Sequence, residues 1–325
     1  MFFMEKNLHN KDNSIAFYEE RYTNGYMDDW PADKKQRVFN LIKSLSLPKQ
    51  GKVVEFGCGN GVFTEVIRQS LPNWIVYGTD ISNVAIETAK SRYPYCHFFV
   101  AGDPNYNQEQ FDFLLTHHVL EHVYDLNTIA TEMADMMKAN ASMLHILPCG
   151  NQGSLEYNIC LMRSDGTECD VGNRFFFEDR SHLRRLTTEQ LLGQLSFYGF
   201  FLNSGWYSNQ YYGALKWITE YPKEFIMQLT DTTKATSNVN VFKLIWLRKK
   251  LLLIKKARNI TEKKDRRRSF RDVPLTEKFD FLRSLVKIEV AGYLTSYYLN
   301  RAEKEWKTCS LKPNGSEMYL LFTKQ

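Results

Sequence analysis

Glycines and an acid form a turn near residue 57 that can hold a ligand. Glu55, Gly57, Cys58 and Gly59 follow a short apolar run, with the spacing E-x-G-x-G. Glycines at such a turn let the backbone approach a ligand, because no Cβ stands in the way. A dinucleotide fingerprint would need a small residue where Val62 stands, and no Gly-Lys-Ser/Thr follows for a phosphate loop. The turn therefore disfavours NAD and nucleoside triphosphates.

Further residues follow the next two apolar runs in register with this turn. Asp80 ends the second run, where a carboxylate can accept both ribose hydroxyls of an adenosine. Ile81 offers an apolar wall for adenine, and Asp103, after the third run, can reach the adenine amino group. Together with the turn, these residues predict an adenosine site.

Three histidines follow the fourth apolar run. His117, His118 and His122 come just after Thr116, at the edge where ligands bind in open α/β sheets. An imidazole there can take a proton from an oxygen or nitrogen acceptor. The alternative is pocket lining for His117 and His118, and a structural role for His122. His118 and His122 also have metal-ligand spacing, but no third ligand and no H-E-x-x-H is evident, so we expect no metal.

The elements that position these residues are predicted from apolar residues, which occur alternately in short continuous runs and at helical spacing. Short apolar runs predict buried parallel strands, and segments of helical spacing lie between them, one opened by Ser82 as N-cap. Strand–helix alternation is typical of a doubly wound α/β sheet. The expected strands are Lys52–Phe56, Ile75–Thr79, Cys96–Val100, Phe111–Thr116, Ser142–Leu147, Phe200–Tyr207 and Glu317–Thr323.

These motifs together resemble the class I S-adenosylmethionine-dependent methyltransferases. The likeness covers residues 50–150 and ends in His118-Val119-Leu120-Glu121-His122-Val123, which looks like the turn of the small-molecule and lipid-quinone subgroup. It implies a Rossmann-like seven-stranded sheet with an antiparallel last strand. It also implies S-adenosyl-L-methionine as cofactor and S-adenosyl-L-homocysteine as product. The cofactor positions carried over are Glu55, Gly57, Cys58, Gly59, Asp80, Ile81, Asp103, Thr116 and His117, the last two near the sulfonium.

The resemblance divides the chain into three parts. Residues 1–48 form an N-terminal helical cap, whose Tyr18, Tyr22, Tyr26 and Trp30 either cover the cofactor as a lid or pack on the sheet edge. Residues 49–212 together with 309–325 form the cofactor-binding core. Residues 213–308 form a helical, basic insertion before the last strand.

A long polar segment, Pro148–Arg185, follows the fifth expected strand. Loops of this length in a compact domain are usually functional or disordered. We expect a pocket here for a sugar or a phosphorylated group. The alternative is an ordinary helix N-terminal region with solvated charges. The expected anchors are Arg163, Arg174, His182 and Arg184.

Charge is uneven along the 325 residues. The net charge is +5, yet Lys243–Arg271 alone carries a net of +11. Within it, Leu244, Leu247, Leu251 and Ile254 share one helical face. We rank three interpretations: packing of this face on a core or a second subunit, contact with an anionic membrane that presents a lipid-linked substrate, and nucleic-acid binding.

We therefore expect a methyltransferase acting on a small polar, sugar-containing or lipid-linked acceptor, at oxygen, in glycan or natural-product tailoring. The alternatives are a nucleic-acid methyltransferase that uses the basic insertion, and a non-catalytic cofactor-binding scaffold or regulator. Six cysteines without a Cys-x-x-Cys pair, no apolar run of about 20 residues and no signal peptide favour a cytoplasmic protein. Residues 243–271 are expected to make any peripheral contact at the inner face of the membrane. The oligomeric state is left open.

Overall fold

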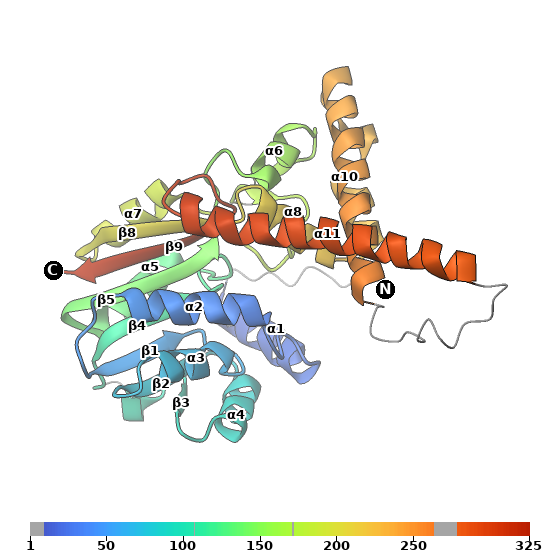
Figure 1. Cartoon of the computed structure of the whole chain (residues 1–325). Coiled ribbons are helices and arrows are strands. Elements are labelled where there is room, and N and C mark those ends of the chain that lie inside the picture. Colours follow the sequence, from blue (N-terminus) through green and yellow to red (C-terminus); the bar gives the residue numbers. More distant parts are fainter. Residues whose placement is uncertain (1–9, 107, 171, 263–277) are drawn as a thin grey trace. The chain divides into compact units, whose positions relative to one another are not determined.

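The computed structural model describes residues 10–106, 108–170, 172–262 and 278–325 (Figure 1). Packing divides the chain into two units. The sheet unit consists of Met1–Cys149, Asp179–Gly205 and Met318–Gln325, and the helical unit of Gly150–Glu178 and Trp206–Glu317. Residues 150–178, which the sequence analysis assigned to the cofactor-binding core, group with the inserted helices in the helical unit.

Seven strands form one sheet in the order β3-β2-β1-β4-β5-β9-β8. Neighbouring strands from β3 to β5 are parallel, and β9 runs antiparallel to them (Figure 1). The predicted Rossmann-like α/β fold with an antiparallel last strand is thus confirmed. The bounds are β1 Lys52–Phe56, β2 Ile75–Asp80, β3 His97–Val100, β4 Phe111–His117, β5 Met137–Pro148, β8 Phe200–Ser208 and β9 Glu317–Lys324.

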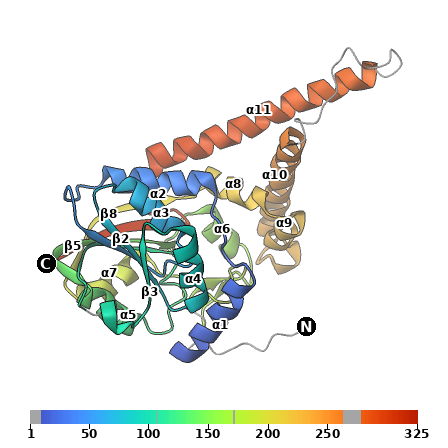
Figure 2. The same ribbon diagram turned by 90° about the horizontal axis from the view of Figure 1, so that it is seen from below.

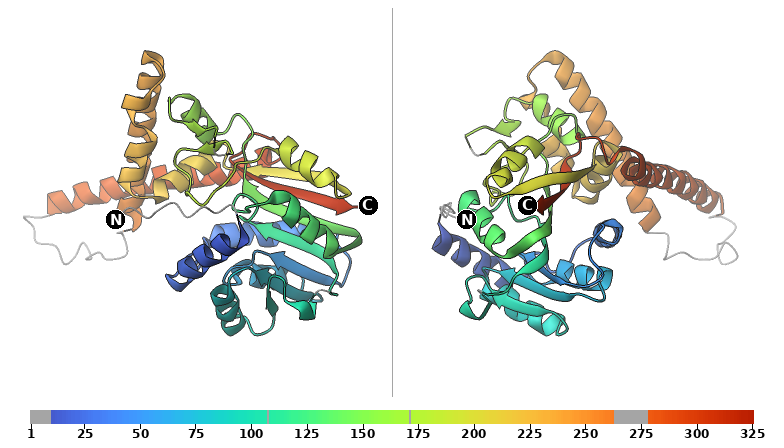
Figure 3. Two further views of the ribbon diagram at one scale, coloured as in Figure 1. Left: turned by 180° about the vertical axis from the view of Figure 1, so that it is seen from behind. Right: turned by 90° about the vertical axis from the view of Figure 1, so that its left-hand side faces the viewer.

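The central strands are mostly apolar because helices cover the sheet on both faces. Val53 and Val54 of β1 lie opposite Phe113 and Leu114 of β4, and all four are completely buried. Helices α2 (Ala32–Ser44), α3 (Val62–Ser70) and α4 (Asn83–Arg92) cover one face, and α5 (Leu126–Asp135) and α7 (Thr188–Ser196) the other (Figures 1 and 3). The sheet unit also contains α1 (Lys11–Thr23) and the short η1 (Pro104–Tyr106).

Two helices of the sheet unit begin at N-cap residues whose side chains bind the first backbone N–H groups. Ser82 caps α4 by accepting a hydrogen bond from the backbone N–H of Ala85 at 3.1 Å. Thr187 caps α7 and forms a reciprocal pair of hydrogen bonds with Gln190. These caps fix where the connecting loops end, and therefore where the loops can meet a ligand.

The helical unit contains two long helices, α10 (Asn238–Glu262) and α11 (Lys278–Cys309), which pack on each other and on α8 (Tyr212–Glu220) (Figure 2). The segment expected as a polar loop is partly regular, with α6 (Leu155–Leu161) and a small hairpin of β6 (Thr167–Glu168) and β7 (Arg174–Phe175). The remaining elements are α9 (Lys223–Leu229) and η2 (Thr232–Lys234).

The apolar stripe of α10 packs as the first-ranked interpretation expected. Leu247, Leu251 and Ile254 join residues of α6, α8 and α9 in one buried cluster, and Leu244 is completely buried. Residues 263–271 of the basic segment lie outside the described residues. In the part of the chain that the structure describes, no helix combines the length and apolar character needed to cross a bilayer.

Candidate active site

The glycine turn packs directly against the segment that follows β4. Gly57 has a left-handed backbone with φ of 75°, and Gly59 has φ of 50°. A Cβ added to Gly57 would lie 2.5 Å from Cγ2 of Val119, closer than any real contact. Both the conformation and the space therefore demand glycine at residue 57. The backbone of the turn at Gly57 therefore packs directly against the Val119 side chain of the histidine-bearing segment.

Asp80 is held in place by backbone groups of the same turn. Its Oδ2 accepts a hydrogen bond from the N–H of Gly59 at 2.8 Å, and its Oδ1 accepts one from the N–H of Ser82 at 3.0 Å. Burial raises the pKa of Asp80, although these N–H groups favour its charged form. Each carboxylate oxygen keeps a further lone pair for a ribose hydroxyl. The arrangement fits the predicted adenosine site.

The other predicted cofactor residues lie around this turn. Ile81 follows Asp80 directly and is half-buried. Asp103 lies in the loop after β3, where its Oδ1 accepts hydrogen bonds from the backbone N–H and the side-chain amide of Asn105. Cys58 is buried, and burial raises the pKa of its thiol. Such a thiol stays protonated and packs as a small apolar group.

Glu55 lies beneath the turn with an exposed fraction of 2%. The hydroxyl of Thr64, on α3, donates a hydrogen bond to its Oε2. Burial raises the pKa of Glu55 to about 8, against the opposing effect of that hydrogen bond. The carboxyl group is therefore neutral at physiological pH and braces β1 against α3. Direct contact of Glu55 with the cofactor stays a prediction.

Helix α1 lies across the turn and is fastened on both sides. The Tyr22 hydroxyl lies 2.6 Å from the position of a Cβ on Gly59. Glu19 accepts hydrogen bonds from the backbone N–H groups of Asn83 and Val84 at the start of α4. Arg21 donates to Asp179 at 2.8 Å. This placement is compatible with the expected lid, whose role stays a prediction.

Two histidines of the central strands are enclosed by other side chains. His117 packs its ring on Phe63 with centroids 3.8 Å apart, and on Trp30 at 4.6 Å. Thr116 Oγ1 lies 2.8 Å from Nδ1 of His145, and both residues are completely buried. The sequence analysis did not select His145. A histidine inside the apolar run of the fifth strand was the available signal.

His118 forms a carboxylate–histidine pair with Glu121. Its Nδ1 lies 3.0 Å from Oε1 of Glu121, and its Nε2 lies 2.9 Å from the Lys34 ammonium. Because an ammonium only donates, Nε2 accepts, and the ring proton is on Nδ1, which faces the carboxylate. Glu121 thereby fixes the tautomer and the orientation of the imidazole.

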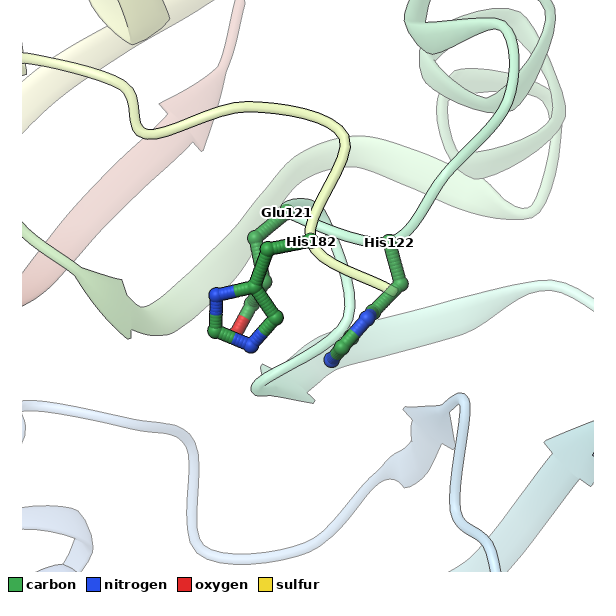
Figure 4. Close-up of side chains that lie close together, drawn as sticks. All are labelled: Glu121, His122 and His182. Atoms are coloured by element: carbon green, nitrogen blue, oxygen red, sulfur yellow. The ribbon is translucent and has the colours of Figure 1, made fainter. Parts of the chain in front are cut away.

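Glu121, His122 and His182 point toward one another beside this pair (Figure 4). Burial alone would raise the pKa of Glu121, but the hydrogen bond from His118 and the neighbouring imidazoles lower it to about 2. Burial lowers the pKa of His122 to about 4, so its ring is neutral at physiological pH. The sequence analysis quoted Glu121 within a motif but gave it no role.

The four predicted acceptor anchors belong to different units. Arg163 is buried in the helical unit, where its guanidinium pairs with Asp165 and donates to the carbonyl of Gln228. Arg174 pairs with Glu168 across the small hairpin of the same unit. In the sheet unit, Arg184 donates to the carbonyl groups of Leu120 and Val123 below the histidine turn, and His182 lies beside His122. An acceptor pocket built from all four stays a prediction.

Comparison with known proteins places this site in a family. The family described as "Methyltransferase domain" matches residues 26–202, which is more than half of the chain. The chain therefore belongs to this methyltransferase family. The match, the sheet order and the site together confirm the predicted class, an S-adenosylmethionine-dependent methyltransferase domain of class I, and S-adenosylmethionine as its cofactor.

Individual relatives match over shorter stretches. The malonyl-[acyl-carrier protein] O-methyltransferase 1 of Ilyobacter polytropus is 33% identical over 81 residues, 24% of this chain and 30% of the relative. The trans-aconitate 2-methyltransferase of Variovorax paradoxus is 36% identical over 58 residues, 18% of this chain and 22% of the relative. The chain thus spans less than a third of the length of these two relatives.

Solved structures with this fold include a TehB-like methyltransferase from Corynebacterium glutamicum. It is 15% identical, with a TM-score of 0.36, and the match covers 60% of this chain and 86% of the other.

The state of Glu55 predicts a pH dependence of stability. Its pKa is higher in the folded chain than the ordinary value of 4.5, so the unfolded chain loses the proton first and stability falls as the pH rises from about 5 to about 8. Glu55→Gln removes this loss. We therefore expect the free energy of unfolding of the variant, relative to that of the wild type, to be higher at pH 8 than at pH 5 by on the order of 4 kcal/mol.

Urea unfolding at pH 5 and pH 8 measures the difference, with exposed Glu87→Gln as the matched control. If the free energy of unfolding of Glu55→Gln changed with pH in parallel with that of the wild type, the assignment of a neutral, buried carboxyl group at Glu55 would be wrong.

The hydrogen bonds of Asp80 predict the effect of removing its carboxylate. Asp80→Ala loses the ribose acceptor and the two bonds that hold the turn, so we expect S-adenosylhomocysteine to bind about 100-fold more weakly or not at all. Asp103→Ala, in a more exposed loop, should cost about tenfold or less. Isothermal titration calorimetry measures both, and near-normal affinity of Asp80→Ala would refute the ribose assignment.

Proposed function

We propose that this protein methylates a hydroxyl group of a small polar, sugar-containing or lipid-linked acceptor in glycan or natural-product tailoring. One observation carries the proposal: the His118–Glu121 pair, which has the form of a general base with its orienting carboxylate and adjoins the glycine turn. The name of one relative, an O-methyltransferase of malonyl-[acyl-carrier protein], also supports oxygen as the acceptor atom.

Different residues of the chain serve different steps of such a transfer. When bound, S-adenosylmethionine supplies an already activated methyl group, so the protein must mainly align the acceptor and exclude water. Asp80 and the glycine turn fix the position of the adenosine. Helix α1 covers the turn. The lone pair of His118 Nε2 faces the Lys34 ammonium; once an acceptor displaces Lys34, Nε2 takes the acceptor proton and the Glu121 charge stabilises the imidazolium that forms.

A lipid-linked acceptor is supported by the exposed side of α10. Val239, Phe242, Trp246 and Leu253 are each more than half exposed, and they recur at the helical spacing that places them on one side. Lys243, Lys249 and Lys256 are exposed along the same side. Other basic residues of α10 have partners within the helical unit: Arg248 donates to Thr230, and Arg258 pairs with Glu220. A stripe of aromatic residues and lysines suits an anionic membrane surface.

Replacement of the proposed base tests the chemistry. We expect His118→Gln to lower kcat by roughly 100-fold or more and to leave the affinity for S-adenosylhomocysteine within about twofold. Transfer of a labelled methyl group to a panel of hydroxyl acceptors measures kcat. His97→Gln, an exposed histidine on β3, is the control.

Unchanged turnover in His118→Gln would remove His118 as the base. Cofactor binding without turnover on the whole panel would favour the scaffold alternative, and turnover on nucleic acid alone would favour the nucleic-acid enzyme.

Liposome flotation tests the membrane contact of α10. We expect the wild type to float with vesicles that contain phosphatidylserine and to remain unbound with vesicles of phosphatidylcholine alone. Phe242→Ala combined with Trp246→Ala should reduce the bound fraction by about tenfold, because each buried aromatic contributes a kcal/mol or more. Val290→Ala, at an exposed position of α11, is the control. Equal flotation of the double variant and the wild type would refute the assigned surface.

A further inference from the structure

Three metal-type donors converge at the carboxyl edge of the sheet. Glu121 and His122 come from the turn after β4, and His182 comes from the loop before α7. One potential ligand atom of each lies within 4.8 Å of those of the other two (Figure 4). The described residues contain no other group of three or more such donors this close together. Two imidazoles and one carboxylate are a donor set of catalytic zinc sites.

The carboxylate of Glu121 is buried and incompletely satisfied. Its exposed fraction is 1%, and Oε1 is paired with His118 Nδ1. Apart from this ion-pair contact, neither Oε1 nor Oε2 has a partner with hydrogen-bond geometry among the described residues. A buried carboxylate oxygen without a hydrogen-bond partner is costly, and a bound cation would compensate for it.

Neighbouring groups orient the donors as they do in metal sites. Nδ1 of His122 lies 3.2 Å from the carbonyl oxygen of Ser181. A carbonyl only accepts, so the ring proton sits on Nδ1 and the lone pair of Nε2 is available. Oε1 of Glu121 faces Nδ1 of His118 at 3.0 Å, so Oε2 is the available carboxylate ligand. A ligand histidine that donates its other N–H to a carbonyl, and a hydrogen-bonded ligand carboxylate, are regular features around bound metals.

The spacing is close to what an ion requires. Ligand atoms about 2.0–2.1 Å from a tetrahedral ion lie roughly 3.4 Å from one another. The ligand atoms now lie within 4.8 Å of one another. To bind an ion they must approach by at most about 1.4 Å, which small side-chain rotations achieve. His182 lies on a loop, and its ring is already 4.6 Å from that of His122 between centroids.

We propose that Glu121, His122 and His182 bind one divalent transition-metal ion of the Zn²⁺ or Co²⁺ kind and leave a coordination position open for a hydroxyl oxygen. The mixed nitrogen and oxygen donors favour such an ion over Mg²⁺. The proposal replaces the expectation of no metal, which rested on the absence of a third ligand near His122 in the sequence.

The open position deepens the proposed function and rests on it. A hydroxyl group bound to the ion would lose its proton near neutral pH, and His118 Nε2 would accept that proton once the Lys34 ammonium, now 2.9 Å away, is displaced. The oxygen lone pair then forms the bond to the methyl carbon while the carbon–sulfur bond breaks, with its electron pair left on sulfur. The ion itself is neither oxidised nor reduced.

Titration with Co²⁺ tests the site without requiring activity. The full chain is treated with a chelator, dialysed and titrated, with visible absorption and calorimetry as readouts. We expect one bound equivalent in the wild type. Glu121→Gln and His182→Ala should each weaken binding at least tenfold, while His97→Ala leaves it unchanged. Cys169→Ser, which removes an exposed thiol, should also leave it unchanged. Mg²⁺ should not displace Co²⁺ at equal concentration.

S-adenosylhomocysteine binding, measured on the same samples, shows that each variant is folded. Loss of Co²⁺ binding in Glu121→Gln or His182→Ala, with cofactor binding retained, supports the site. Unchanged Co²⁺ affinity in both variants overturns it, as does no binding by the wild type at millimolar Co²⁺. If the wild type transfers methyl groups normally but does not bind Co²⁺, only the metal site is rejected. If the wild type binds no cofactor, the proposed function is rejected.

Discussion

The contact between Gly57 and Val119 determines how the carboxyl edge of the sheet is built. A side chain on Gly57 would overlap the side chain of Val119, so the backbone of the cofactor turn lies directly against the segment after β4. Val119 directly follows His118 and precedes Glu121 by two residues. The same packing that opens space for the cofactor therefore also brings the base, its carboxylate and the histidine cluster alongside it.

Two buried glutamates of this edge show how surroundings decide charge. Glu55 meets a hydroxyl group and apolar side chains, and its pKa of about 8 keeps it neutral. Glu121 is equally buried, but imidazoles surround it and its pKa falls to about 2. Burial favours the neutral form in both. Glu121, unlike Glu55, lies among imidazoles, which is why it can orient a base or bind a cation while Glu55 braces the fold.

The sequence predicts the features that are encoded locally. Strands appear as apolar runs, Ser82 as a helix cap, and the adenosine residues as acids at fixed places after strands. The seven-residue α6 and the two-residue strands β6 and β7 are too short for a periodic signal. His182 joins His122 only through packing of the loop before α7, which no spacing rule reveals. The partners of Arg163 and Arg174, Asp165 and Glu168, are close in sequence but were not distinguishable from other charges of a polar segment.

Helix α1 contacts both halves of the site. Its Tyr22 lies over Gly59, and its Tyr18 packs edge-on against His122 with ring centroids 6.0 Å apart. Glu19 and Arg21 anchor the same helix to α4 and to Asp179. Displacing this helix therefore has the same free-energy cost whether the cofactor turn or the histidine cluster is to be uncovered. By thermodynamic linkage, a molecule that displaces it from the turn makes the histidine cluster easier to reach, and the reverse holds by the same factor.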